Sequence, residues 1–169
     1  MDCKWNFLFT NNNINFNNMK PSLKQLSDLQ HAYACERTRM PANYVVRTKY
    51  TDSTANGLTR CVTDYITFIG GQAERISNTG RYIDDSKIVT DILGNRKKIG
   101  SSKYIKGQGT NGTADISATY KGRSIKIEVK MNDKQSEAQK EYQQMIERAG
   151  GIYFICHNFD EFLEKFNTI

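Results

Sequence analysis

Residues 113–130 read TADISATYKGRSIKIEVK, and this stretch decides the fold class of the chain. In each half, apolar side chains alternate with polar ones, which is the spacing of a β-strand that buries one face. Lys121-Gly122 lies between the halves and predicts a two-residue turn. The stretch is therefore predicted to form a β-hairpin, with Asp115 directly opposite Glu128 and Lys130 further along the same polar face.

Helices and further strands surround the hairpin in the sequence. Apolar residues at helical spacing predict three helices, and short apolar runs bounded by glycine predict two strands. Ser136 and Gln139 have the spacing of a capping box at the start of one of these helices. The predicted elements are a helix over 58–69, a strand over 72–76, a helix over 136–149, a strand over 152–156 and a helix over 158–166. This order predicts an α/β fold in which helices cover a mixed sheet.

The rest of the chain is less regular. Residues 1–50 are predicted to be an N-terminal extension to a domain at 51–169, with an asparagine-rich start, a short helix from Pro21 and a possible strand over 44–50. Residues 78–112 are predicted to be loop-like. The sequence shows no secretion signal and no membrane-spanning run, so we expect a cytoplasmic protein without a membrane partner. Four cysteines without a C-x-x-C pair predict free thiols.

The charge balance is basic, with 24 lysines and arginines against 18 acidic residues and a formal charge of +6. Such a balance favours a polyanionic partner, because basic side chains release counterions from phosphates. A basic cluster falls between Asp91 and Thr110, and two interpretations of it stay open, a phosphate-binding segment and a solvated loop. The cluster consists of Arg96, Lys97, Lys98, Lys103 and Lys106.

The polar face of the predicted hairpin brings two carboxylates and an amine together. Like charges opposed across a strand pair destabilise a sheet. A bound divalent cation removes that penalty, and the oxygen ligands of Asp115 and Glu128 suit Mg²⁺, with Mn²⁺ as a substitute. On alternation alone another interpretation stays open, a solvated face on which Lys126 and Lys130 neutralise the two acids.

A resemblance to known nucleases adds to this pattern. The residues GTAD at 112–115, followed after twelve residues by EVK at 128–130, resemble the PD-(D/E)xK signature of restriction-endonuclease-like nucleases. A narrower resemblance is to VRR-NUC domains, which occur as standalone phage and bacterial proteins and at the end of larger DNA-repair nucleases. It is carried by IEVK at 127–130, SEAQ at 136–139 and GG at 150–151, and covers roughly residues 54–166.

The resemblance implies a restriction-endonuclease-like mixed β-sheet core flanked by helices. It also implies an Mg²⁺ site formed by Asp115, Glu128 and the backbone carbonyl of Val129, with Lys130 as the catalytic lysine. Gln139 would project toward the same site. The alternative is that Gln139 only caps its helix, and both roles together would require two side-chain conformers.

Several further residues bear on the implied site. Asn56 stands where many VRR-NUC domains have a glutamate, so a second strong metal site is in doubt; Asp64 and Glu74 are not expected to replace it. Arg75 is expected either to contact a phosphate or to pair with a nearby acid. In a nuclease the basic cluster would overhang the cleft and position the duplex. Its phosphate contacts would be Lys97, Lys98, Lys103 and Lys106.

The resemblance thus implies a metal-dependent DNA endonuclease that hydrolyses phosphodiesters with a metal-activated water. The expected substrates are branched or structured DNA, such as Holliday junctions or flaps, and the expected assembly is a homodimer. If the protein is phage-encoded, it would act in the host cytoplasm. Two alternatives stay open: a catalytically inactive nuclease fold that binds nucleic acid as an accessory protein, and an RNA-directed nuclease of the same fold.

Overall fold

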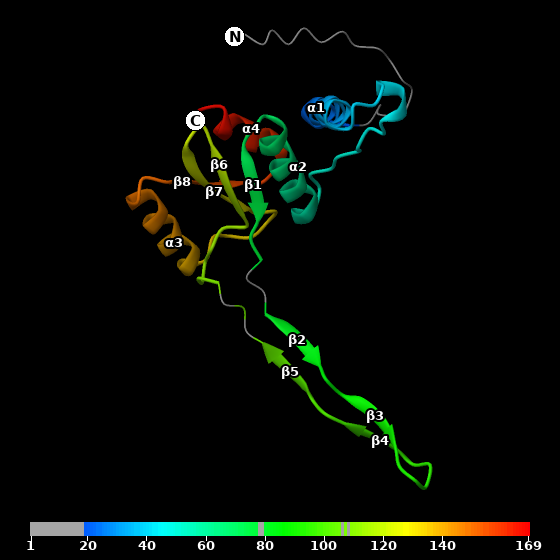
Figure 1. Cartoon of the computed structure of the whole chain (residues 1–169). Coiled ribbons are helices and arrows are strands. Elements are labelled where there is room, and N and C mark those ends of the chain that lie inside the picture. Colours follow the sequence, from blue (N-terminus) through cyan, green and yellow to red (C-terminus); the bar gives the residue numbers. More distant parts are fainter. Residues whose placement is uncertain (1–18, 78–79, 106, 108) are drawn as a thin grey trace.

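The computed structural model describes residues 19–77, 80–105, 107 and 109–169 (Figure 1). This part of the chain contains α-helices, one short 3₁₀-helix (η1) and strands. In chain order they are α1 (Pro21–Thr38), η1 (Ala42–Tyr44), α2 (Ala55–Phe68), β1 (Gln72–Arg75), β2 (Arg81–Asp84), β3 (Lys87–Thr90), β4 (Arg96–Ile99), β5 (Ser102–Ile105), β6 (Ile116–Tyr120), β7 (Arg123–Val129), α3 (Glu137–Arg148), β8 (Ile152–Cys156) and α4 (Phe159–Phe166).

A four-stranded sheet forms the centre of the molecule, in the order β1-β6-β7-β8. The pairs β1–β6 and β6–β7 are antiparallel, whereas β7 and β8 run parallel. Parallel neighbours need a crossover connection, and α3 supplies it. The chain therefore has a mixed sheet with helices, which confirms the predicted α/β class.

The predicted hairpin is confirmed together with its register. β6 and β7 are its two strands, and Tyr120 pairs with Arg123 across the turn. The backbone φ is 48° at Lys121 and 76° at Gly122, so both central residues are left-handed, as a type I′ turn requires. This turn has the same twist as the strands it joins, and its length sets which residues face each other.

The core lies on one face of the sheet. The apolar side chains of β6 and β7 pack there with α2 and α4, and α2 and α3 lie on opposite sides of the sheet in Figure 1. The buried stripe of α4 is made of phenylalanines, and Tyr65 of α2 meets three of them edge-on. Burial of each such ring stabilises the fold by roughly 2–3 kcal/mol. These phenylalanines are Phe159, Phe162 and Phe166.

The segment between α1 and α2 departs from its prediction. The strand predicted over 44–50 is wrong, because residues 42–44 form η1 and the chain then continues without strand pairing to any described residue. Side chains of α1 bond its backbone instead: Ser27 Oγ donates to the Thr48 carbonyl (2.8 Å), and Gln30 Oε1 accepts from the Thr48 N–H (3.0 Å). The helix from Pro21 is present as predicted and packs on the same core.

Residues 81–105 form an arm rather than the predicted loop. β2 pairs with β5 and β3 with β4, both antiparallel, and this ribbon extends away from the sheet (Figure 1). At its far end Asp91 Oδ1 accepts from the backbone N–H of Leu93 (2.9 Å) and of Asn95 (2.8 Å), which closes the turn. The prediction failed because these strands bury neither face, so they lack the alternation that reveals a strand.

The described cysteines agree with the expectation of free thiols. Cys35, Cys61 and Cys156 are free thiols, and Cys3 lies outside the described residues. No described helix combines the length and the apolar character needed to cross a membrane.

Candidate active site

Glu128 lies near the end of β7, on the side of the sheet that faces α3, and only 2% of its surface is exposed. Lys130 follows two residues later, so its side chain is on the same side of the strand. The Lys130 Nζ lies 3.1 Å from Glu128 Oε1, and the lysine side chain is itself only 12% exposed. The sequence predicted a polar face here, but the structure shows a largely buried ion pair.

Asp115 lies one residue before β6, just beyond the last pair of the hairpin ladder. Its backbone carbonyl accepts from the Ile76 N–H (2.7 Å), which holds it against the strand end of β1. Its Oδ2 accepts from the Val129 N–H (3.0 Å), beside Glu128. The structure thus brings the Asp115 side chain into contact with the backbone of β7 beside Glu128, as the hairpin register predicts.

The environment of Glu128 shifts its pKa. Burial raises the pKa of Glu128, and the charge of Asp115 raises that pKa further, while Lys130 opposes the shift. Within the described residues, the second oxygen of Glu128, Oε2, is buried and has no hydrogen-bond partner. A buried carboxylate oxygen without a partner costs free energy, and this atom is available as a ligand for a cation.

Gln139 joins this group from the first turn of α3. The helix begins with the predicted capping box, in which Ser136 Oγ accepts from the Gln139 N–H (3.3 Å) and Gln139 Oε1 accepts from the Ser136 N–H (2.9 Å). The Gln139 Nε2 donates to Glu128 Oε1 at the same time. The expectation that both roles need two conformers is therefore wrong, because the oxygen and nitrogen of one amide divide them.

Gly112 sets how closely α3 approaches the turn that precedes Asp115. A Cβ at this position would lie 2.1 Å from the Ala138 carbonyl oxygen and 2.7 Å from the Gln139 N, and the backbone φ is +76°. Only glycine fits such a contact in this backbone conformation. The loop before β6, which carries Asp115, is therefore in close contact with the first turn of α3, which carries Gln139.

Lys126 does not take the role that the solvated-face interpretation gives it. Its Nζ donates to Ser117 Oγ, the side chain of its pairing partner on β6. Among the described lysines, Lys130 is the one that forms a salt bridge with Glu128.

Tyr153 is a neighbour of the site that sequence reasoning missed. It lies on β8 opposite Lys126, and its ring meets that of Tyr142 on α3 at a centroid distance of 6.4 Å. Burial, and next the charge of Glu128, raise the pKa of Tyr153 to about 12, so its hydroxyl keeps its proton at neutral pH. The only signal in the sequence was its place in an apolar strand, where a tyrosine hydroxyl stands among apolar side chains.

The other polar candidates lie on α2 and β1. Asp64 Oδ2 accepts from the Tyr50 hydroxyl (2.7 Å) and pairs with Arg60 (3.6 Å). Glu74 is exposed on β1, and Asn56 is exposed in the first turn of α2.

The predicted phosphate contacts separate into two places. Arg75 is exposed at the end of β1, whereas Lys97 and Lys98 lie on β4 and Lys103 on β5. These lysines therefore lie on the arm rather than on a loop over the cleft, because the segment pairs with itself. Lys106 lies outside the described residues.

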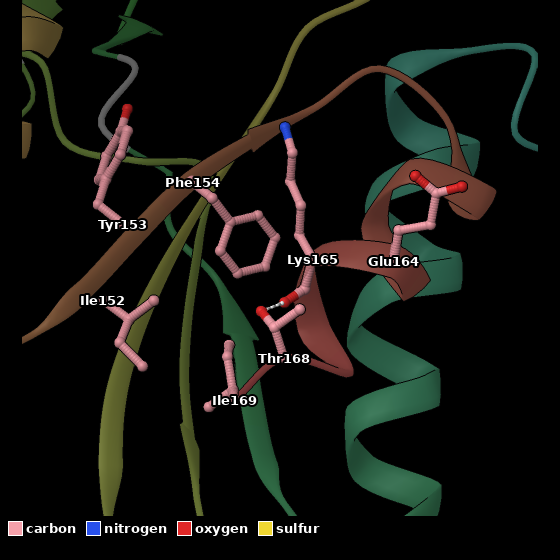
Figure 2. Close-up of a pocket in the computed structure, with 7 residues that line it drawn as sticks. All are labelled: Ile152, Tyr153, Phe154, Glu164, Lys165, Thr168 and Ile169. Carbon is pink, nitrogen blue, oxygen red and sulfur yellow. Dashed lines mark hydrogen bonds between the residues drawn. The ribbon is translucent and has the colours of Figure 1, made fainter.

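The described cavities do not coincide with the carboxylates. One of about 380 Å³ lies between β8 and the chain end after α4 (Figure 2), and another of about 300 Å³ lies between α1 and α4. The first is lined by Ile152, Tyr153, Phe154, Glu164, Lys165, Thr168 and Ile169. None of the four candidate site residues lines either of these two cavities.

Comparison with known proteins does not extend this assignment. No protein-family model matches the chain, and no curated protein matches it.

Proposed function

We propose that this chain is a metal-dependent DNA endonuclease with a restriction-endonuclease-like fold of the VRR-NUC type. The single observation that carries the proposal is the state of Glu128. It is buried, it lies beside Asp115, and one of its oxygens has no partner in the described part of the chain. A purely structural ion pair would bond both oxygens, since half-satisfied buried carboxylates destabilise a fold.

The donor set fits Mg²⁺ or Mn²⁺. Glu128 Oε2 and the Asp115 carboxylate would hold the cation together with the Val129 carbonyl, and water would fill the remaining positions, as Mg²⁺ usually retains several waters. When bound, the cation would polarise a phosphoryl oxygen and lower the pKa of a coordinated water. Among the described residues, no three acidic, histidine or cysteine side chains gather as a metal group, so backbone and water ligands are essential to this assignment.

The other residues of the site would act through charge and position. Lys130 carries its ammonium next to the carboxylates and would stabilise the negative charge that grows on the phosphoryl group in the transition state. Gln139 would fix the orientation of Glu128 through its hydrogen bond, as a positioning residue. Asp115 is itself oriented by the Val129 N–H.

Branched or structured DNA is the proposed substrate, and a homodimer is the proposed assembly. Both follow from the resemblance to VRR-NUC domains, and the basic charge of the chain supports a polyanionic substrate. The test is to incubate the purified protein with labelled linear, nicked, flap and four-way DNA in Mg²⁺, Mn²⁺ or EDTA. Cleavage in the metals but not in EDTA is expected.

Asp115→Ala separates the enzyme from an inactive binding module. This variant should lose cleavage while it retains DNA binding in EDTA. Wild-type protein that binds all these DNAs but cleaves none in either metal would instead support the accessory-protein alternative. Cleavage of RNA but not DNA would support the RNA-directed alternative.

A further inference from the structure

The arm exposes side chains on both of its faces. Its two ladders contain eight cross-strand pairs, and in five of them a basic residue faces an aliphatic one. These pairs are Arg81–Ile105, Ile83–Lys103, Lys87–Ile99, Ile88–Lys98 and Val89–Lys97. A two-stranded ribbon without a covering layer is only marginally stable in water, so this composition indicates a surface that is covered when the protein functions.

The tip of the arm is apolar. Ile92 and Leu93 form the turn, and their exposed fractions are 102% and 82%. Large apolar side chains at the end of an extended element are what architectural DNA-binding proteins insert between base steps. An apolar tip at the end of a basic ribbon is suited to a double-stranded nucleic acid, in which the phosphates lie outside and the stacked bases lie inside.

Charge complementarity selects nucleic acid over a second copy of this chain. Between residues 80 and 105 the arm has six basic residues and three acidic ones. Two copies of the arm would therefore repel each other. Lys98 has the one salt bridge found within the described arm, at 3.7 Å from Asp84, and both side chains are more than half exposed. The other lysines and arginines of the arm are exposed, so they are accessible to the phosphates of a polyanion.

The shape of the arm selects B-form DNA. A two-stranded β-ribbon can enter a groove of B-DNA, and apolar wedges are inserted between base steps from the minor-groove side, whereas the major groove of A-form RNA is too narrow for side chains to enter. Residues 81–91 span about 35 Å at about 3.3 Å per residue, which is close to one turn of the duplex. The arm leaves the sheet after Arg75 and returns just before Asp115, so its base is at the strand ends that carry the carboxylates.

We propose that the arm binds duplex DNA next to the active site, with its lysines on phosphates and with Ile92 and Leu93 against the bases. The inference rests on the proposed nuclease function for its choice of substrate, but its test needs no cleavage. Binding of a linear DNA duplex is measured in EDTA by fluorescence anisotropy at several salt concentrations. The compared proteins are the wild type, Lys97→Gln/Lys98→Gln and Lys121→Gln/Arg123→Gln.

The last variant is a matched control, because it removes the same charge from the turn at the other end of the β6–β7 hairpin. The arm variant should bind more weakly and lower the slope of log affinity against log salt by about two, while the control stays near the wild type. A duplex RNA of the same sequence should bind more weakly than the DNA. Equal effects of the two variants, or equal binding of RNA and DNA, would overturn the proposal.

Contact between the tip of the arm and the bases is measured in a separate experiment. A DNA duplex containing 2-aminopurine should gain fluorescence on binding, because a wedge unstacks the probe, and Ile92→Ser/Leu93→Ser should abolish that gain. The molar mass in solution is measured on the same variant. If the tip variant instead changes the mass from dimer to monomer and leaves the fluorescence gain intact, the arm contacts a second copy and the proposal is wrong. These binding measurements are made in EDTA and need no cleavage, so a failed nuclease proposal and a failed arm proposal give different results.

Discussion

Gln139 connects Glu128 to the start of α3 through one amide group, with its oxygen on the Ser136 N–H and its nitrogen on the Glu128 carboxylate. Helix stability and the orientation of the proposed metal ligand therefore depend on the same side chain. A capping residue whose polar atoms are divided in this way makes the N-terminus of α3 part of the site.

Replacement of Gln139 should affect both properties, and replacement of Ser136 only one. Gln139→Ala loses its half of the capping box, the bond to the Ser136 N–H, together with the bond to Glu128, so we expect a loss of about 1 kcal/mol in unfolding free energy and a roughly 10–100-fold slower cleavage. Ser136→Ala should cost a similar stability but keep the Glu128 bond and near-normal cleavage. Urea unfolding and single-turnover cleavage measure the two effects. Equal losses of cleavage in both variants would show that Gln139 acts only through its helix.

Gly112 and Gly122 form a matched pair for the packing of α3. Both have a φ of +76°, but a Cβ at Gly112 would clash with the Ala138 carbonyl, whereas at Gly122 nothing lies within 4 Å. Gly122→Ala should cost about 1 kcal/mol for the left-handed backbone alone. Gly112→Ala should cost several kcal/mol in the same unfolding experiment and reduce cleavage, because α3 must move away. Equal costs would contradict the close contact.

Glu128→Gln should stabilise the metal-free protein at neutral pH. The pKa of Glu128 is raised by its burial and by Asp115, so the folded state binds its proton more tightly than the unfolded state does. Stability from this group is present at low pH and lost as the pH rises above the usual carboxyl value of 4.5. At pH 7 the variant should therefore unfold at a higher temperature than the wild type, measured in EDTA.

The same variant should respond differently to metal. Mn²⁺ should raise the Tm of the wild type, because a ligand that binds the folded state stabilises it, and it should leave Glu128→Gln unchanged. The gap between the two proteins in EDTA should narrow as the pH is lowered toward 4.5. An equal Mn²⁺ response of both proteins would place the cation away from Glu128.

Glu161 has the opposite pH behaviour. Its burial alone would raise its pKa, but hydrogen bonds from Lys165 and from His157 lower it to about 2. The stability it contributes is therefore present above the usual carboxyl pKa and is lost as the pH falls toward 2. Glu161→Gln should destabilise the protein by roughly 1–2 kcal/mol at pH 7 and by much less near pH 2. A pH-independent difference in urea unfolding would contradict this role.

The central hairpin could be predicted because the alternation of its apolar and polar residues indicates that one face is buried. Ile125, Ile127 and Val129 alternate with polar residues, and Lys121-Gly122 marks a turn whose length sets the register. The order of Asp115, Glu128, Lys130 and Gln139 was likewise visible in the sequence. The burial of Glu128 was not, because it depends on α3 lying over a face that reads as polar.

The arm could not be predicted for a related reason. In β3 and β4, Ile88 faces Lys98 and Val89 faces Lys97, so each face of the ribbon carries apolar and basic residues together. Periodicity detects a strand only when one face is apolar, and here neither face packs against the protein. The segment 45–50 gave the opposite error, a predicted strand where none forms. Its apolar residues suggest a strand, but its backbone forms hydrogen bonds with side chains of α1.

The most direct measurement is single-turnover cleavage of a labelled four-way DNA junction in Mn²⁺ by the wild type and by Lys130→Met. This substitution removes the ammonium beside Glu128 without removing a proposed metal ligand. We expect the wild type to cut the junction and the variant to bind it but cut roughly 100–1000-fold more slowly. A wild-type protein that leaves the junction whole, or a variant that cuts at the wild-type rate, would contradict the proposed active site.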